Sequence, residues 1–279
     1  MPIEQFRNAM QAAGIEPPAY ICGDGQIHRF YIKGDKSGTL NGAYQLHLNG
    51  KSNGWFEDWR GLKVKWTSSD KSQSFTKEMR KQLEENRRQK AIEEQLRHEQ
   101  SAFNAQFIWS KSSAVITHPY LERKRVKPHN TRLYRDSLVI PIYSEFRELV
   151  NLQFIQCDGS KRFLSGGRKK GCFSVIKSTT GNTDIVLICE GWATGGSLSE
   201  HTGHQVVIAL DAGNLSITAT AIRNIYPKAE IVICGDNDLS GIGQRAARDA
   251  AVACGGTYKI PATVETDWND ALAGGVVNG

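Results

Sequence analysis

The stretches DIVLICE at 184–190 and EIVICGDND at 230–238 decide the fold of this chain. Each is a short apolar run, rich in β-branched residues, that is followed at once by acidic side chains. Two similar runs are QVVIAL at 205–210 and TYKI at 257–260, and segments with helical patterns separate the four runs at 193–201, 215–227 and 243–255. Apolar strands that alternate with helices predict an α/β fold, with a mostly parallel sheet covered by helices on both faces.

The region before this pattern predicts antiparallel strands. SLVIPIYS at 137–144, ELVNLQFIQ at 148–156 and RFLSGG at 162–167 are strand-like, and Asp158-Gly159 between the last two suits a hairpin. Near the N-terminus, a short amphipathic helix at about 3–13 precedes HRFYIKG, YQLHLNG and GWFEDW, which are separated by turns such as Gly34-Asp35 and Asn49-Gly50. We expect a small antiparallel sheet there, whose aromatic residues either fill its core or bind DNA.

A long charged segment joins these regions. Residues 70–108 contain no Gly or Pro and are rich in Glu, Gln, Lys and Arg, which predicts a long exposed helix. A solvated linker is the favoured interpretation and a nucleic-acid-binding helix the alternative, because acids and bases nearly cancel along it. The expected division is a β-rich N-terminal domain at 1–68, a helical linker at 69–110, a basic α+β subdomain at 111–180 and an α/β domain at 181–279.

Composition narrows the class of protein. The net charge of +6 makes a polyanionic partner plausible without requiring one. The six cysteines contain no C-x-x-C pair, and Cys22, His28 and His47 make a poor zinc set, so no zinc is expected. There is no signal-peptide pattern and no apolar run of membrane-spanning length. A cytoplasmic protein with no membrane partner is therefore expected.

Acidic residues at strand ends predict a metal site. Glu190 ends the first quoted run, and Asp236 and Asp238 end the second at a spacing that points both carboxylates to one side. Ligands of such sheets bind beyond the carboxyl ends of the strands, and crowded carboxylates need a hard cation such as Mg²⁺ or Mn²⁺. The alternative is that these acids cap helices. Asp267 is expected to cap the last helix, and Asp270 is a weaker candidate for an outer metal contact.

These motifs resemble the Toprim domain. Over about 184–275, an E-G pair follows one strand, a D-x-D follows a later strand and helices lie between them. The preceding segment, LVIPIYSEFRELVNLQFIQCDGSKRFLSGGRKKGCFSV, is similar to the basic subdomain of primases encoded by plasmids, phages and other mobile elements, which are related to the catalytic core of the bacterial replicative primase. The resemblance implies a DNA primase, a nucleotidyltransferase that makes short RNA primers on single-stranded DNA from nucleoside triphosphates during DNA replication.

The resemblance also implies roles for individual residues. Glu190, Asp236 and Asp238 would be the catalytic residues and hold the metal ion, with Asp270 as an additional metal contact. A basic patch would bind nucleic acid or nucleotide phosphates and consists of Lys161, Arg162, Arg168, Lys169 and Lys170. No P-loop motif occurs, so a separate replicative helicase is the expected partner for unwinding. A Toprim-type metal-dependent nuclease and a non-catalytic module that binds single-stranded DNA remain as alternatives.

Overall fold

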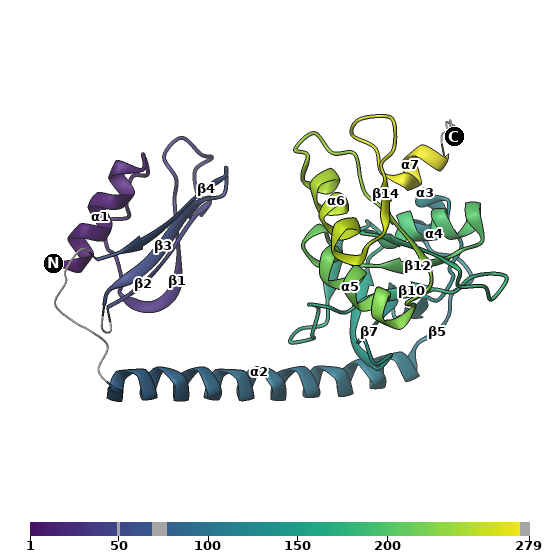
Figure 1. The fold of residues 1–279 in the computed structure, drawn as a ribbon, viewed down its shortest axis with the longest axis horizontal. Helices are drawn as coiled ribbons and strands as arrows, with labels where there is room; N and C mark the ends of the chain where they lie inside the picture. The colour runs from purple at the N-terminus through teal and green to yellow at the C-terminus, as the bar shows by residue number, and fades with distance from the viewer. Residues whose placement is uncertain (49–50, 69–76, 274–279) are drawn as a thin grey trace. The chain divides into compact units, whose positions relative to one another are not determined.

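The computed structural model describes residues 1–48, 51–68 and 77–273, which divide into two compact units, Met1–Ala91 and Ile92–Gly279 (Figure 1). None of the helices in the described residues is both long and apolar enough to cross a membrane. The predicted division into four parts is finer than these two units and stays a prediction.

The first unit is a helix packed on a small antiparallel sheet. Helix α1 (Pro2–Ala12) precedes strands β1 (Asp24–Phe30), β2 (Gly42–His47), β3 (Asn53–Asp58) and β4 (Leu62–Thr67), which pair in that order. Phe6 and Met10 of α1 are fully buried against the sheet together with Phe30, whereas Trp59 is 59% exposed. The predicted helix and antiparallel sheet are confirmed, β4 was not predicted, and the predicted Asn49-Gly50 turn lies outside the described residues.

Helix α2 (Lys77–Lys111) is the long charged helix that the composition predicts. Its described side chains between residues 84 and 97 are exposed, as expected for a solvated helix. Its last turns behave differently, because Ala105 is fully buried and Ile108 and Trp109 pack on the sheet that follows. The end of this helix is therefore part of the core of the second unit. The predicted residues 70–76 lie outside the described residues.

The second unit begins with an antiparallel sheet. Its strands β5 (Ser113–Ala114), β6 (Arg132–Tyr134), β7 (Ser137–Tyr143), β8 (Leu149–Ile155) and β9 (Lys161–Phe163) pair in chain order, and helix α3 (Pro119–Lys124) lies between the first two. Gly159 has a φ of 90°, in the left-handed region, at the predicted hairpin between β8 and β9.

The α/β pattern folds into a second sheet. Its strands are ordered β10 (Ser174–Ile176), β12 (Gln205–Ile208), β11 (Ile185–Cys189), β13 (Glu230–Cys234) and β14 (Thr257–Lys259). All neighbours are parallel except β10, an antiparallel edge strand that the sequence did not predict. Helices α4 (Trp192–Thr202), α5 (Leu215–Ile225), α6 (Ile242–Cys254) and α7 (Trp268–Ala273) follow the expected pattern.

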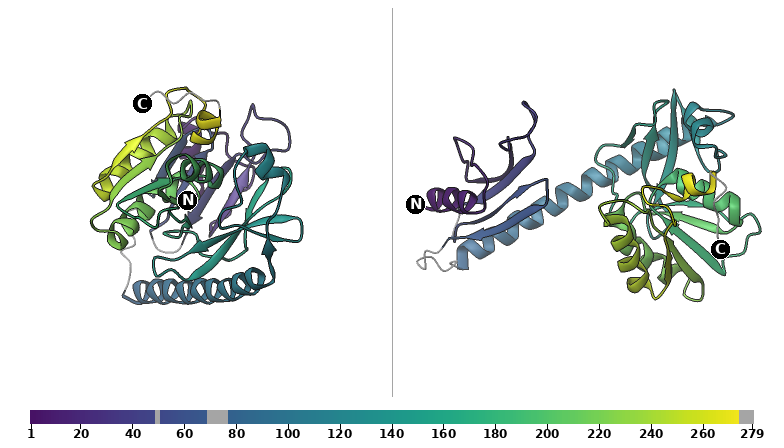
Figure 2. Two further views of the ribbon diagram at one scale, coloured as in Figure 1. Left: turned by 90° about the vertical axis from the view of Figure 1, so that its right-hand side faces the viewer. Right: turned by 90° about the horizontal axis from the view of Figure 1, so that it is seen from above.

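Helices cover both faces of this parallel sheet (Figures 1 and 2), and its strand residues alternate between two cores. Val186 and Ile188 of β11 join the core formed with α5 and α6. Leu187 and Cys189 point to the opposite face, where α4 and residues of the antiparallel sheet form the other core. Burial on both faces is the reason that the strands are continuously apolar. The predicted fold class is confirmed, and the two sheets of the second unit share one core.

Candidate metal centre at the edge of the parallel sheet

Three adjacent parallel strands end in acidic residues. Cys189 of β11 pairs with Cys234 of β13 and with Ile208 of β12, so the three strands end at one edge of the sheet. Glu190 follows β11 directly, Asp236 comes two positions after β13, and Asp211 comes three positions after β12. The predicted proximity of Glu190 and Asp236 follows from the order of the strands, because β11 and β13 are direct neighbours in the sheet.

The carboxyl groups of Glu190 and Asp236 are incompletely satisfied. Each has one buried carboxylate oxygen, Oε1 and Oδ1 respectively, with no hydrogen-bond partner. Burial, together with the negative charges of Asp236, Asp211 and Asp238, raises the pKa of Glu190 to about 7. Burial and the charges of Asp267, Asp238 and Asp270 raise the pKa of Asp236 to about 6, although Lys161 opposes this.

Asp238 lies in a different environment. Its Oδ1 accepts hydrogen bonds from Ser240 Oγ at 2.6 Å and the Ile242 amide at 3.1 Å, and its Oδ2 accepts one from the Gly243 amide at 2.7 Å. These donors, led by Ser240, lower the pKa of Asp238. The carboxylate thus satisfies the first amides of α6, which is the capping role that was the alternative for acids after strands. Oδ1 already accepts two hydrogen bonds, whereas Oδ2 accepts one and retains a further lone pair for a cation.

The D-x-D segment is held by the residue between the two acids. The Asn237 side-chain amide donates to Pro261 O at 2.8 Å and to Thr263 O at 3.1 Å, and its main chain pairs with Thr266. Gln244 Nε2 donates to Asn237 Oδ1 at 2.8 Å. These contacts tie the segment to the chain that leads into α7 and fix where Asp236 lies.

Two acids near the centre were missed as site residues. Asp267 is the charge that most raises the pKa of Asp236, and Asp211 contributes to that of Glu190. Asp267 also accepts a hydrogen bond from the Asp270 amide at 2.8 Å, so it caps α7 as predicted. Asp270 itself is exposed and lies 3.5 Å from Lys124 Nζ. Strand register alone does not bring residues 267–270 to this edge, so Asp267 was predicted only as a helix cap.

Members of the predicted basic patch lie in different surroundings. Lys169 forms an ion pair with Asp211, and the ammonium of Lys161 lies in the field of Asp267 and Asp236, although desolvation and Lys124 lower its pKa overall. The remaining members make other contacts: Arg168 pairs with Glu145 at 2.5 Å, Arg162 lies 4.8 Å from the Phe154 ring centroid, and Lys170 is exposed. Two of the five predicted basic residues thus lie against the acidic edge, together with Lys124.

The acidic edge fits a magnesium ion that keeps part of its water shell. Orphaned buried oxygens on Glu190 and Asp236, and pKa values raised by mutual repulsion, are what a divalent cation relieves. Within the described part of the chain, the carboxylates of Glu190, Asp236 and Asp238 do not all approach within 4.8 Å of one another. Mg²⁺ commonly binds through one or two carboxylates and several waters, so a closed cage is not required.

The chain is similar to known proteins in sequence and in fold. Residues 185–275 match the model of the Toprim domain family. Two Escherichia coli proteins named DNA primase TraC are 31% and 29% identical to the chain, each over 93% of its length, but the chain spans only 26% and 19% of those relatives. The primase fragment of the bacteriophage T7 primase-helicase protein aligns with 59% of this chain and 70% of its own, with 13% identity and a TM-score of 0.44.

Proposed function

We propose that this chain, whose residues 185–275 belong to the Toprim domain family, is a DNA primase that makes short RNA primers on single-stranded DNA. The similarity to the TraC primases over 93% of the chain supports this activity. The main structural support for this activity is the acidic edge of the sheet. Glu190 and Asp236 each have a buried oxygen there without a hydrogen-bond partner, and lysines lie beside these residues. A divalent cation and a phosphate chain together would neutralise both kinds of charge.

Glu190, Asp236 and Asp238 are the proposed catalytic residues and would hold Mg²⁺ or Mn²⁺, with Asp270 as an outer contact. When bound, the cation supplies charge stabilisation for transfer of a nucleotidyl group from a triphosphate. The hydrogen bonds from Ser240, Ile242 and Gly243 hold Asp238 in one orientation before any ligand arrives. The pKa of about 7 means that Glu190 is half protonated near neutral pH until a cation binds.

The basic patch is the proposed path for the template and the nucleotide phosphates. Lys161 and Lys169 would bridge phosphates to the acidic edge, a role supported by their nearness to its carboxylates. Arg162, Arg168 and Lys170 would contact the template backbone farther from the metal. A separate helicase would unwind the duplex, and the cytoplasm is the proposed location.

The test is a priming reaction with labelled ribonucleoside triphosphates, Mg²⁺ and single-stranded DNA. The proposal expects short RNA products that need all three components and that disappear in Asp236→Ala. The matched control Asp249→Ala removes an exposed acid from α6, and it should prime like wild type. Digestion of labelled DNA without triphosphates would instead show a nuclease, and DNA binding with neither activity would show a binding module. Either result would refute the proposed activity.

A further inference from the structure

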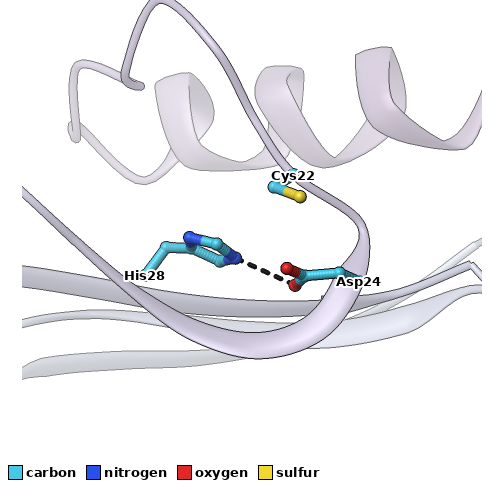
Figure 3. A group of neighbouring side chains, drawn as sticks. All are labelled: Cys22, Asp24 and His28. Carbon is cyan, nitrogen blue, oxygen red and sulfur yellow. Dashed lines mark hydrogen bonds and ion pairs between the residues drawn. The ribbon is translucent and has the colours of Figure 1, made fainter.

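Three side chains of different chemistry meet in the first unit, far in sequence from the acidic edge. One ligand atom each from Cys22, Asp24 and His28 lies within 4.8 Å of the other two (Figure 3). His28 Nε2 and Asp24 Oδ1 are 2.9 Å apart. Cys22 and His28 are half-buried and Asp24 is exposed, so an ion from solvent can reach the group. Nothing in the proposed primase chemistry uses these residues.

The local backbone brings the three residues together. The pairing of β1 with β2 shifts register between Asp24 and Ile27, and Gly25 has a φ of 74° inside this irregularity. Asp24 Oδ1 accepts a hydrogen bond from the Gln26 amide at 2.9 Å, which closes the turn. The bulge therefore turns the side chains of Asp24 and His28 toward the chain that precedes the strand.

One buried tyrosine holds two of the three residues. The Cys22 amide donates to the hydroxyl of Tyr44 at 2.9 Å, and the ring of His28 stacks on the Tyr44 ring at a centroid distance of 5.2 Å. Tyr44 is 2% exposed and belongs to the core of the sheet. Cys22 and His28 are thereby oriented from outside the group itself, as ligand side chains in metal sites usually are.

We propose that Cys22, Asp24 and His28 bind a zinc ion or a similar borderline transition metal. A thiolate, an imidazole and a carboxylate are the three ligand types that Zn²⁺ takes in proteins, and soft sulfur disfavours Mg²⁺ and Ca²⁺. Tetrahedral zinc would separate the nitrogen and oxygen ligands by about 3.3 Å, so the present 2.9 Å contact needs to open only slightly. A water completes the fourth position.

Metal binding requires each of the three ligand atoms to be free of its proton. Hydrogen bonds from His28 and from the Gln26 amide lower the pKa of Asp24 to about 2, so this ligand is already an anion at neutral pH. Binding through Nε2 requires the His28 tautomer that carries its proton on Nδ1. The thiol proton of Cys22 is released to solvent when its sulfur binds the metal.

This site departs from the expectation that the chain holds no zinc. That expectation rested on the lack of a C-x-x-C pair and on the poor zinc set that Cys22, His28 and His47 make. A C-x-D-x₃-H spacing carries no such signal, because only the irregular pairing of β1 turns the three side chains toward one another.

The test uses the full chain, stripped of metal and then kept in excess Mg²⁺ so that the acidic edge does not take the probe. Co²⁺ is titrated first, because a cobalt–thiolate bond gives a charge-transfer absorption in the near ultraviolet, and Zn²⁺ then competes for the site. Wild type should bind one Co²⁺ through sulfur and exchange it for Zn²⁺. Cys22→Ser should lose the band, and His28→Gln should bind Zn²⁺ at least tenfold more weakly. Cys157→Ser removes the exposed cysteine of the second unit and should behave like wild type.

A second measurement needs no variant. Zn²⁺ should protect Cys22 of the wild-type chain from alkylation, mapped by mass spectrometry, while Cys157 stays reactive. Absence of the cobalt band in wild type, its persistence in Cys22→Ser, or alkylation of Cys22 that ignores Zn²⁺ would overturn the site. None of these readouts involves primer synthesis, so they fail or succeed independently of the proposed function.

Discussion

The substitution Asp236→Asn should stabilise the metal-free protein while it abolishes metal binding. In the folded chain, burial and neighbouring acids raise the pKa of Asp236 from 3.8 to about 6. The ionised carboxylate is therefore destabilising above pH 6 when no cation is present. Asparagine has nearly the same shape without the charge, so it removes the repulsion with Glu190 and Asp267.

The size of the effect follows from the pKa. A difference of about 2 corresponds to about 3 kcal/mol if it is fully expressed in stability. Because Asp236 is only half-buried and solvent screens part of the repulsion, we expect ~1–2 kcal/mol. For a unit of this size, that gain raises the unfolding midpoint by roughly 3–6 °C.

The pH dependence has a defined sign. The folded chain holds protons on Asp236 and Glu190 between their ordinary pKa values, 3.8 and 4.5, and the raised values of about 6 and about 7. The unfolded chain has released them in this range, so the stability of the metal-free protein falls as pH rises from about 4 to about 7. Asp236→Asn should flatten this slope.

The assay is calorimetric unfolding at pH 8, with chelator or with excess Mg²⁺. The transition of the second unit is recognised in wild type because Mg²⁺ raises it. In Asp236→Asn, this transition should lie higher than in wild type under chelator and should no longer respond to Mg²⁺. Asp249→Asn, on the exposed face of α6, is the control and should change neither property. A variant less stable than wild type under chelator would refute the reasoning.

Three further predictions concern the same edge. The Mg²⁺ affinity of wild type, measured by calorimetric titration, should rise about tenfold from pH 6 to pH 8, because the Glu190 carboxyl, with a pKa of about 7, ionises in this range. Glu190→Gln should bind Mg²⁺ more weakly and with less pH dependence. A wild-type affinity that does not change with pH would contradict this prediction. Gly243→Ala should abolish priming, because the added Cβ would lie 2.8 Å from a main-chain oxygen of the D-x-D segment. Gly191→Ala should stay active, because the nearest contact of its Cβ would be 3.5 Å away. Equal activities of the two variants would contradict this reasoning. Lys161→Ala should weaken binding of single-stranded DNA and reduce the slope of log affinity against log salt by about 0.7. The exposed control Lys228→Ala should leave this slope unchanged. An unchanged slope in Lys161→Ala would show that Lys161 does not contact the DNA.

Sequence patterns predicted the parallel sheet well because its physics is local. Residues 186–189 and 231–234 are buried on both faces of the sheet, so every one of them is apolar. Helices with apolar stripes between the runs leave few alternatives to a parallel sheet. The ends of these runs then place Glu190 and Asp236 at one edge without further information.

The rest of the site depends on tertiary packing. Asp267 reaches Asp236 only because Asn237 pairs with Thr266 outside the regular strands. Strand β10 has three residues and an antiparallel direction set by the neighbouring β12, so its own sequence carries little signal. The buried end of α2 was predicted as exposed, because Ile108 and Trp109 follow a long charged stretch that dominates its composition.

The central claim is that Glu190 and Asp236 share one divalent ion, and anomalous diffraction from a crystal of the chain soaked in Mn²⁺ tests it most directly. We predict one strong peak between β11 and β13, with oxygens of both carboxylates at about 2.0–2.4 Å. A peak held by the D-x-D segment while the Glu190 carboxylate points elsewhere, or no peak at this edge, would contradict the account.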